Sequence, residues 1–540
     1  MKRIYYISAL ILMAVSFASC LDQDPKDQLT EEEMYDNATN IYVNAVATLY
    51  NYIGGSAESE GLQGTGRGVY DYNTLTTDEV IIPVRGGDWY DGGFWTNLYL
   101  HQWTENDASL YNTWTYLYKV VMLANKSLAM IDKYDYRLTE QQKLVNNAEV
   151  RAVRAMFYFY IMDMFGRVPV VTSYDTPHTE VRQSGRSEVF RFIFEELQSV
   201  LPYLPTGKSN KEGNNYGRVT APVAYFLLAK LALNAEAYSD DNWIDGIRPD
   251  GRNIFFEVDG NRKNAWETCI YYCNKLAESG YTLESSYAAN FAVNNENSSE
   301  NIFTIPMDKN LYSNQFDYFF RSIHYNHGGA YGWASENGPC ATLSTVKSFG
   351  YGTAQEDTRF ALNFWVGKVV VDGKDVVLDN GTTLEYMPLE VKLDLTGSPY
   401  EKTAGARMAK YEVDRTAYSD GRLPNNDIVL YRYADVLLMK SEAKTRNGED
   451  GTSELNEVRS RAGMSGRAAT LENILEERLL ELVWEGWRRQ DLIRFGKFHQ
   501  SYDLRQRISG EENGYTTVFP IPKRTLDLNK NLTQNPGYHS

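Results

Sequence analysis

The residues whose types and spacing best suit ligand chemistry lie in a glycine-rich run between Arg85 and Trp95. Paired glycines precede and follow Trp89 and Tyr90, and such glycines permit turns that present an aromatic face to solvent. A ring beside carboxylates combines an apolar face with hydrogen-bond acceptors, as binding of a sugar ring requires. We therefore predict a sugar site formed by Asp88, Trp89, Tyr90 and Trp95. The alternative, in which Trp89 turns inward and fills the loop, stays open.

A second run of similar character extends from His324 to Trp333. Tyr325, Tyr331 and Trp333 stand among three glycines there, and we predict that they form a second part of the site. His324 and His327 have i,i+3 spacing, but a metal site needs a further ligand that this run lacks. We therefore expect the histidines to form hydrogen bonds within the loop, and we predict no metal ligand and no cofactor.

Catalytic signatures are missing from the sequence. It contains no nucleophile elbow, phosphate-binding loop, dinucleotide fingerprint or His-Glu-x-x-His motif. Asp88 and Asp91 have the chemistry of glycoside hydrolase carboxylates, but a sequence cannot place two carboxylates across a glycosidic bond. The prediction is that the protein is not an enzyme.

The first twenty residues have the pattern of an export signal. Residues 2–3 are positive, residues 7–17 form a short apolar run, and Ala18-Ser19-Cys20 ends the segment. A cysteine directly after small residues resembles a bacterial lipobox, which implies removal of residues 1–19 and acylation of Cys20. The alternative is an ordinary cleaved signal with a chance cysteine. No later segment reaches the roughly twenty apolar residues of a membrane span, so we expect anchoring through lipid on Cys20 alone.

Composition narrows the function classes further. The formal net charge is -17 and the basic residues are not clustered, which argues against nucleic-acid binding. Of the four cysteines, Cys20 is assigned to lipid, and Cys269 and Cys273 lie four residues apart in a helical pattern. We expect these two to pack inside a helix interface and not to bind a metal. Aromatic residues make up 13% of the chain, and most of them must form the core.

Apolar periodicity predicts a mainly α fold. The expected helices span residues 40–53, 108–131, 139–165, 187–201, 221–238, 266–279, 428–447, 453–462 and 471–498. Thr139 and Gln142 are spaced as a capping box. We predict one body over residues 20–540, with helical scaffold segments at about 30–53, 108–280 and 428–498. Loop-rich segments at about 54–107 and 281–427, with short strands at residues 368–371 and 376–378, are expected to bind the ligand.

Alanines at crossing positions favour close helix pairs like those of tetratricopeptide repeats, although the strict repeat consensus is absent. Ala224, Ala229, Ala232 and Ala235 have this spacing. Irregular helical packing remains the alternative. The charged residues at Arg151, Arg154 and positions 485–494 lie beside apolar faces, and we expect them to form ion pairs between packed helices.

Five landmarks in order along the chain resemble the SusD/RagB family of outer-membrane nutrient-binding lipoproteins of Bacteroidetes. They are Thr77-Asp78-Glu79, residues 148–155 with 163–169, residues 430–438, residues 485–494, and residues 519–522 with Gln534-Asn535-Pro536-Gly537-Tyr538. The acidic residues after Cys20 also resemble the surface-export tag of such lipoproteins.

The resemblance implies tetratricopeptide-like helix pairs that support a loop-rich half carrying the glycan site. It implies a location on the outer membrane at the cell surface, and a SusC-like TonB-dependent transporter as partner for an oligo- or polysaccharide ligand. It places the binding aromatics after the Thr-Asp-Glu landmark and in the mid-chain loops, in agreement with the two groups above. Three alternatives remain: capture of peptides or glycopeptides, a secreted glycoside hydrolase, and a scaffold that binds only protein.

Overall fold

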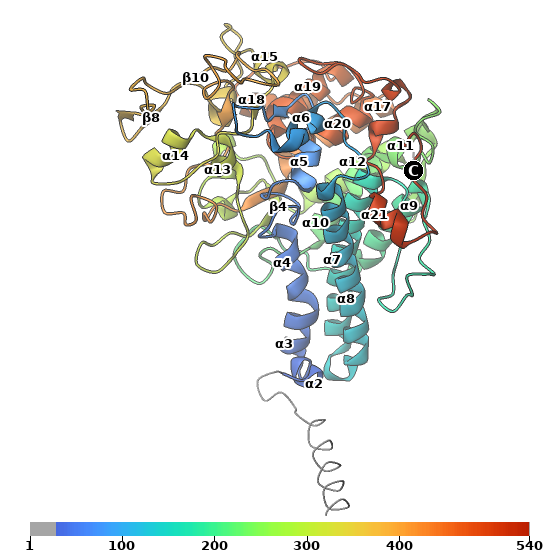
Figure 1. The fold of residues 1–540 in the computed structure, drawn as a ribbon. Coiled ribbons are helices and arrows are strands. Elements are labelled where there is room, and N and C mark those ends of the chain that lie inside the picture. Colours follow the sequence, from blue (N-terminus) through green and yellow to red (C-terminus); the bar gives the residue numbers. More distant parts are fainter. Residues whose placement is uncertain (1–28, 539–540) are drawn as a thin grey trace, which may run out of the picture.

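The computed structural model describes residues 29–538 (Figure 1). The predicted signal segment and Cys20 lie outside the described residues. The described chain is mainly helical, with short strands, and this confirms the predicted fold class. No helix in residues 29–538 is both long and apolar enough to cross a membrane.

The two longest helices, α7 (Ala108–Lys133) and α8 (Glu140–Phe165), pack side by side. Beside them runs a helical segment made of α3 (Ala38–Ile41), a π-helical stretch (Tyr42–Ala47) and α4 (Thr48–Gly54). Figure 1 shows these helices extending together below the rest of the molecule, after the short α2 (Glu31–Met34). Helix α8 begins at the predicted capping box, in which Thr139 and Gln142 satisfy each other's backbone N–H groups.

The remaining scaffold helices pack in succession on α8. Helix α9 contacts α8, α10 contacts α12, and α12 contacts α17. Their bounds are α9 (Arg186–Val200), α10 (Ala221–Leu233), α11 (Ala235–Tyr238), α12 (Ala265–Glu278), α17 (Tyr433–Asn447), α18 (Thr452–Arg461), α19 (Leu471–Leu482), α20 (Arg488–Arg494) and α21 (Lys523–Leu528). Ala224, Ala229 and Ala232 of α10 are fully buried. Cys269 and Cys273 of α12 are buried and free, as predicted.

Two predicted helix boundaries are wrong. The helix expected from residue 428 begins only at Tyr433, because Ile428–Arg432 forms strand β12, which pairs antiparallel with β4 (Asn301–Ile305). Every residue of this pair is buried, and a contiguous apolar run does not distinguish a buried strand from a helix. The helix expected over 471–498 is interrupted between Leu482 and Arg488, where Trp484 and Gly486 have φ values of 69° and 74°.

The loop-rich segments contain more helix than predicted. They hold α5 (Val69–Thr74), α6 (Phe94–Tyr99), α13 (Tyr318–Ser322), α14 (Tyr325–Tyr331), α15 (Leu343–Ser348) and α16 (Phe360–Asn363). Apart from β4, their strands are two-residue pieces in antiparallel pairs: β1 (Val80–Ile81) with β5 (Cys340–Ala341), β6 (Phe364–Trp365) with β11 (Arg407–Met408), β7 (Gly367–Lys368) with β10 (Glu385–Tyr386), and β8 (Val370–Val371) with β9 (Lys374–Asp375). The strand expected at 376–378 is only a single bridge at Val377. A hairpin of two four-residue strands, β2 (Phe255–Val258) and β3 (Asn261–Asn264), precedes α12.

The predicted ion pairs between packed elements are present, and each has at least one buried partner. Arg151 and Arg154 of α8 both bind Glu196 of α9. In the C-terminal cluster, Arg489 binds Asp163 at 2.9 Å. Arg488 binds both carboxylate oxygens of Asp78 at 2.7 Å. The Asp78–Arg488 pair joins the loop-rich half to the scaffold, and it holds the start of the polypeptide segment that leads to the candidate site.

Candidate functional site

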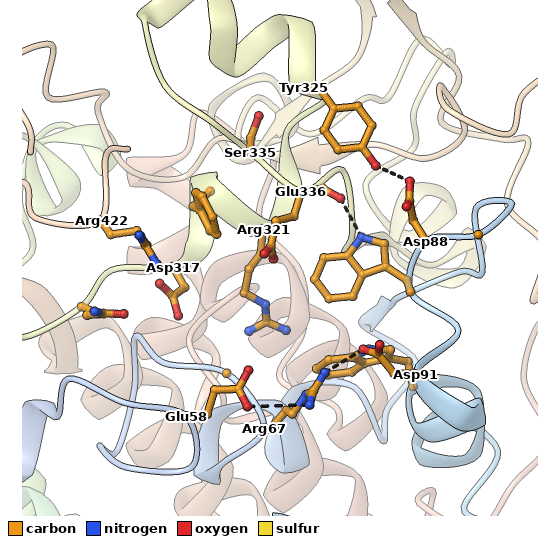
Figure 2. Close-up of a pocket in the computed structure, with 16 residues that line it drawn as sticks. Glu58, Arg67, Asp88, Asp91, Asp317, Arg321, Tyr325, Ser335, Glu336 and Arg422 are labelled. Atoms are coloured by element: carbon orange, nitrogen blue, oxygen red, sulfur yellow. Dashed lines mark hydrogen bonds and ion pairs between the residues drawn. The ribbon is translucent and has the colours of Figure 1, made fainter. Parts of the chain in front are cut away.

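A pocket of about 520 Å³ opens where the loop between Val84 and α6 meets helices α13 and α14 (Figure 2). Its aromatic lining residues are Trp89, Trp95, Phe320 and Tyr325. Its charged lining residues are Glu58, Arg67, Asp88, Asp91, Asp317, Arg321, Glu336 and Arg422. The first and second predicted groups therefore contribute to one pocket, although more than 200 residues separate them in the chain.

Trp89 forms one wall of the pocket. Its backbone lies in the left-handed region, with φ of 61°, and its ring is partly buried. The indole N–H donates a 2.7 Å hydrogen bond to the carbonyl oxygen of Glu336. The ring also covers Gly338, where an added Cβ would lie 2.4 Å from it, so only glycine fits there. Trp89 is thus held through one edge of its ring. It neither faces solvent freely nor fills the interior of the loop, which were the two orientations considered above.

Trp95 supports Trp89 from beneath. It lies in α6, is buried, and meets Trp89 edge to face with the ring centroids 5.4 Å apart. Its indole N–H donates to Asp91 Oδ2 at 2.7 Å, and Arg67 Nη2 donates to the same oxygen at 2.7 Å. The Arg67 guanidinium carbon lies 5.3 Å from the Trp95 ring centroid. These contacts among Trp89, Trp95, Asp91 and Arg67 form the floor of the pocket without any ligand.

Asp88 connects the two predicted groups. Its Oδ2 accepts hydrogen bonds from the Tyr325 hydroxyl and, at 2.8 Å, from Lys402 Nζ. These hydrogen bonds, that of Lys402 first, lower the pKa of the Asp88 carboxyl. A general acid for glycoside hydrolysis needs a raised pKa instead. Asp91 is also occupied by two donors. The two carboxylates considered for a hydrolase therefore act as structural acceptors.

Three of the predicted residues are not in the pocket. Tyr90 is 60% exposed and does not line the pocket. Tyr331 and Trp333 form a separate cluster, with ring centroids 5.2 Å apart. The Arg415 guanidinium lies 4.8 Å from the Tyr331 ring centroid, and Trp333 packs on Gly421. The structure thus brings together Asp88, Trp89, Trp95 and Tyr325 only.

Several charged lining residues were not predicted. Arg321 of α13 binds Asp71 of α5 through both terminal nitrogens at 3.1 to 3.2 Å. Its guanidinium carbon is 5.4 Å from the Trp95 ring centroid. Asp317 precedes Arg321 by four residues, and this helical spacing was a sequence signal that the two side chains lie on one face, although Arg321 pairs with Asp71 and not with Asp317. Glu336 gave no such signal, because it is placed by the turn that receives Trp89.

His324 forms a hydrogen bond within its own run, as predicted, whereas His327 contacts Tyr386 outside that run. His324 Nδ1 accepts the backbone N–H of Asn326 at 3.0 Å and caps α14. His327 Nδ1 lies 3.1 Å from the Tyr386 hydroxyl. Burial lowers the pKa of both imidazoles, to about 4 and about 3. Within residues 29–538, no group of three His, Cys, Asp or Glu residues is placed to hold a metal ion.

Comparison with known proteins defines the class of molecule. The model described as "SusD family" matches residues 299–538, and the model described as "Starch-binding associating with outer membrane" matches residues 32–233. These matches cover both the scaffold and the loop-rich half. The chain belongs to the SusD family, as the sequence landmarks predicted.

Individual relatives extend along nearly the whole chain. Starch-binding protein SusD of Bacteroides thetaiotaomicron is 24% identical, over 99% of each chain. A SusD-like protein of Bacteroides ovatus is 25% identical, over 92% of this chain and 84% of its own. Among solved structures, surface glycan-binding protein A from Bacteroides thetaiotaomicron in complex with laminarihexaose aligns with a TM-score of 0.68 and 21% identity, over 92% and 99% of the two chains. The first and the third of these relatives are named as binding proteins, which agrees with the prediction that the chain is not an enzyme.

Proposed function

We propose that the protein binds an oligo- or polysaccharide in the Trp89 pocket at the cell surface. In this proposal it is anchored to the outer membrane by lipid on Cys20, and it delivers the glycan to a SusC-like TonB-dependent transporter. The observation that carries the glycan-binding part is the pocket itself. A partly exposed indole lies on a preformed aromatic floor and is surrounded by carboxylates, which matches the apolar faces and hydroxyl groups of a sugar.

The named relatives support this ligand class. One is named as starch-binding, and another was solved with laminarihexaose. The matching model over residues 32–233 is described as associating with the outer membrane. Lipid attachment is supported by the Ala18-Ser19-Cys20 motif, and the transporter partnership is supported by the family resemblance.

Affinity electrophoresis of the purified chain from residue 21 onward tests the binding. We expect its migration to be retarded in a gel that contains its polysaccharide, and we expect no reducing ends after long incubation with the same glycan. Turnover that survives repurification would favour a hydrolase. Retention by peptides, with no retention by any glycan, would favour peptide capture.

The transporter partnership needs a separate experiment. A tagged full-length protein, extracted from native outer membranes in mild detergent, should co-purify with one TonB-dependent transporter that mass spectrometry identifies. A Cys20→Ala protein, purified from the same cells, serves as the control for capture after lysis. Recovery of the tagged protein alone from wild-type membranes would contradict the partnership.

A further inference from the structure

The charged groups around the Trp89 pocket differ in whether another residue of the chain already pairs with them. The lining contains five carboxylates and three arginines. Figure 2 shows Arg321 in the middle of the pocket, with Arg422 and Asp317 on one side and Asp88 on the other. The partners of each group decide which of them remain available to a ligand.

Two of the arginines are neutralised by the protein itself. Arg321 gives both terminal nitrogens to Asp71. Arg67 donates to Asp91 at 2.7 Å, and its other terminal nitrogen lies 3.7 Å from Glu58. A carboxylate or sulfate of a ligand would have to compete with these existing pairs. The third arginine, Arg422, forms no ion pair within residues 29–538; its Nε donates to the Ser419 carbonyl, and its guanidinium lies 4.4 Å from the Phe320 ring centroid.

Two carboxylates, in contrast, form no ion pair with a cationic side chain of the described chain. Asp317 Oδ1 is buried and has no hydrogen-bond partner in the described chain. Burial raises the pKa of the Asp317 carboxyl to about 6, against the opposing effects of Arg321 and Arg422. Burial also raises the pKa of Glu336. Neither group forms an ion pair within the described residues, so both present acceptors in a pocket that offers one uncommitted arginine.

We propose that this pocket selects uncharged, hydroxyl-rich sugars and rejects glycans that carry carboxylates or sulfates, with Asp317 and Glu336 as the residues that impose the selection. The inference rests on the proposed glycan-binding function. A sugar hydroxyl donates a hydrogen bond to each carboxylate, and neither carboxylate has to give up an ion pair of the described chain to accept it. An anionic substituent has no proton to donate, and it meets two negative groups in a partly desolvated space, where charge repulsion is stronger than in water.

The test compares binding of uncharged and anionic polysaccharides by the wild-type chain and three variants. The uncharged probes are amylopectin, laminarin and xyloglucan, and the anionic probes are polygalacturonate, alginate and chondroitin sulfate. The variants are Asp317→Asn, Glu336→Gln and the double substitution, each of which removes charge with little change of shape. Asp527→Asn on α21, outside the pocket, is the matched control for loss of one negative charge. A melting curve for each variant verifies that it is folded.

We expect the wild-type chain to bind at least one uncharged polysaccharide and none of the anionic ones. Asp317→Asn and Glu336→Gln should each lower the affinity for the uncharged ligand about tenfold, because a charged acceptor forms the stronger hydrogen bond. The double variant should gain measurable retention by an anionic polysaccharide, and Asp527→Asn should behave as the wild type.

Dependence on pH provides a second readout. Binding of the uncharged ligand should weaken as the pH is lowered through about 6, where Asp317 takes up a proton. The charged groups that act on Asp317 are Arg321, Arg422, Glu336 and Asp71. Asp317→Asn should reduce this pH dependence, and Asp527→Asn should retain it.

Tighter wild-type binding of an anionic than of any uncharged polysaccharide would overturn the selectivity. So would full affinity for the uncharged ligand in the double variant. If that anionic binding is lost in Trp89→Ala, the glycan-binding function stands and only the selectivity fails. If no glycan of either class binds, the proposed function itself fails and the selectivity fails with it.

Discussion

Replacing Trp89 by alanine separates the binding role of this residue from its packing role. Part of the indole is already covered by Gly338 and Trp95, so we take roughly 80 Å² of ring, less than half of an indole's surface, as available to a sugar. At about 25 cal/mol per Å², loss of that contact costs about 2 kcal/mol, or about thirty-fold in Kd. Isothermal titration with the retained polysaccharide, or with its oligosaccharides, measures this loss.

The same substitution should also lower stability, by less than removal of a core tryptophan does. Full burial would make the cost about 3–5 kcal/mol. Because Trp89 is only partly buried, and the Glu336 carbonyl can be hydrated in an open pocket, we expect about 2 kcal/mol in a urea unfolding experiment. Trp89→Phe keeps an aromatic face and should lose only a few-fold in affinity.

Tyr90→Ala is the matched control for Trp89→Ala. This neighbouring aromatic is 60% exposed and does not line the pocket, so neither affinity nor stability should change. The binding role assigned to Trp89 is refuted if Tyr90→Ala loses affinity as strongly as Trp89→Ala. It is also refuted if folded Trp89→Ala protein binds the glycan with wild-type affinity.

Three further predictions concern the anchor, the scaffold and the second loop. Cys20→Ala should release the protein from the membrane fraction, and incorporation of labelled palmitate equal to that of the wild type would contradict this. Arg488→Ala should destabilise the fold by about 3–5 kcal/mol, because it leaves the largely buried Asp78 without its cation, and a loss below 1 kcal/mol in urea unfolding would count against that role. Burial lowers the pKa of His324 to about 4, so the unfolded chain takes up the proton first and stability should fall as the pH drops from about 6.5 towards 4. In thermal melts across this range His324→Asn, which can still cap α14, should show a weaker pH dependence, and an unchanged dependence would show that other groups cause it.

The sequence by itself determined most of the scaffold. Helix periodicity and capping depend on residues within a few positions of each other, so the α8 start at the Thr139–Gln142 capping box could be read directly. The buried Cys269–Cys273 pair was predicted from spacing alone. The residue types of the loop between Arg85 and Trp95 also sufficed to predict a candidate site there, and that loop lines a pocket in the folded chain. Family landmarks in the correct order then indicated the fold before any contact was known.

The tertiary structure decided the features that depend on partners far away in the chain. Strand β12 is extended because β4 pairs with it, and its own apolar residues would fit a helix equally well. Asp88 meets Tyr325 across more than 200 residues of sequence, and this contact selects one of the three mid-chain aromatics for the pocket. Trp89 is held half-exposed because Gly338 leaves room for its ring.

The selecting carboxylates illustrate the same limit. Asp317 and Glu336 are ordinary acidic residues in a chain that contains 71 of them. Their importance comes from what surrounds them: Arg321 is already bound to Asp71, and Arg67 to Asp91. A sequence shows which side chains carry charge, but only the folded chain determines which charges are neutralised internally and which remain for a ligand. Desolvation and pairing are properties of three-dimensional neighbours, and loops from distant parts of the sequence supply those neighbours here.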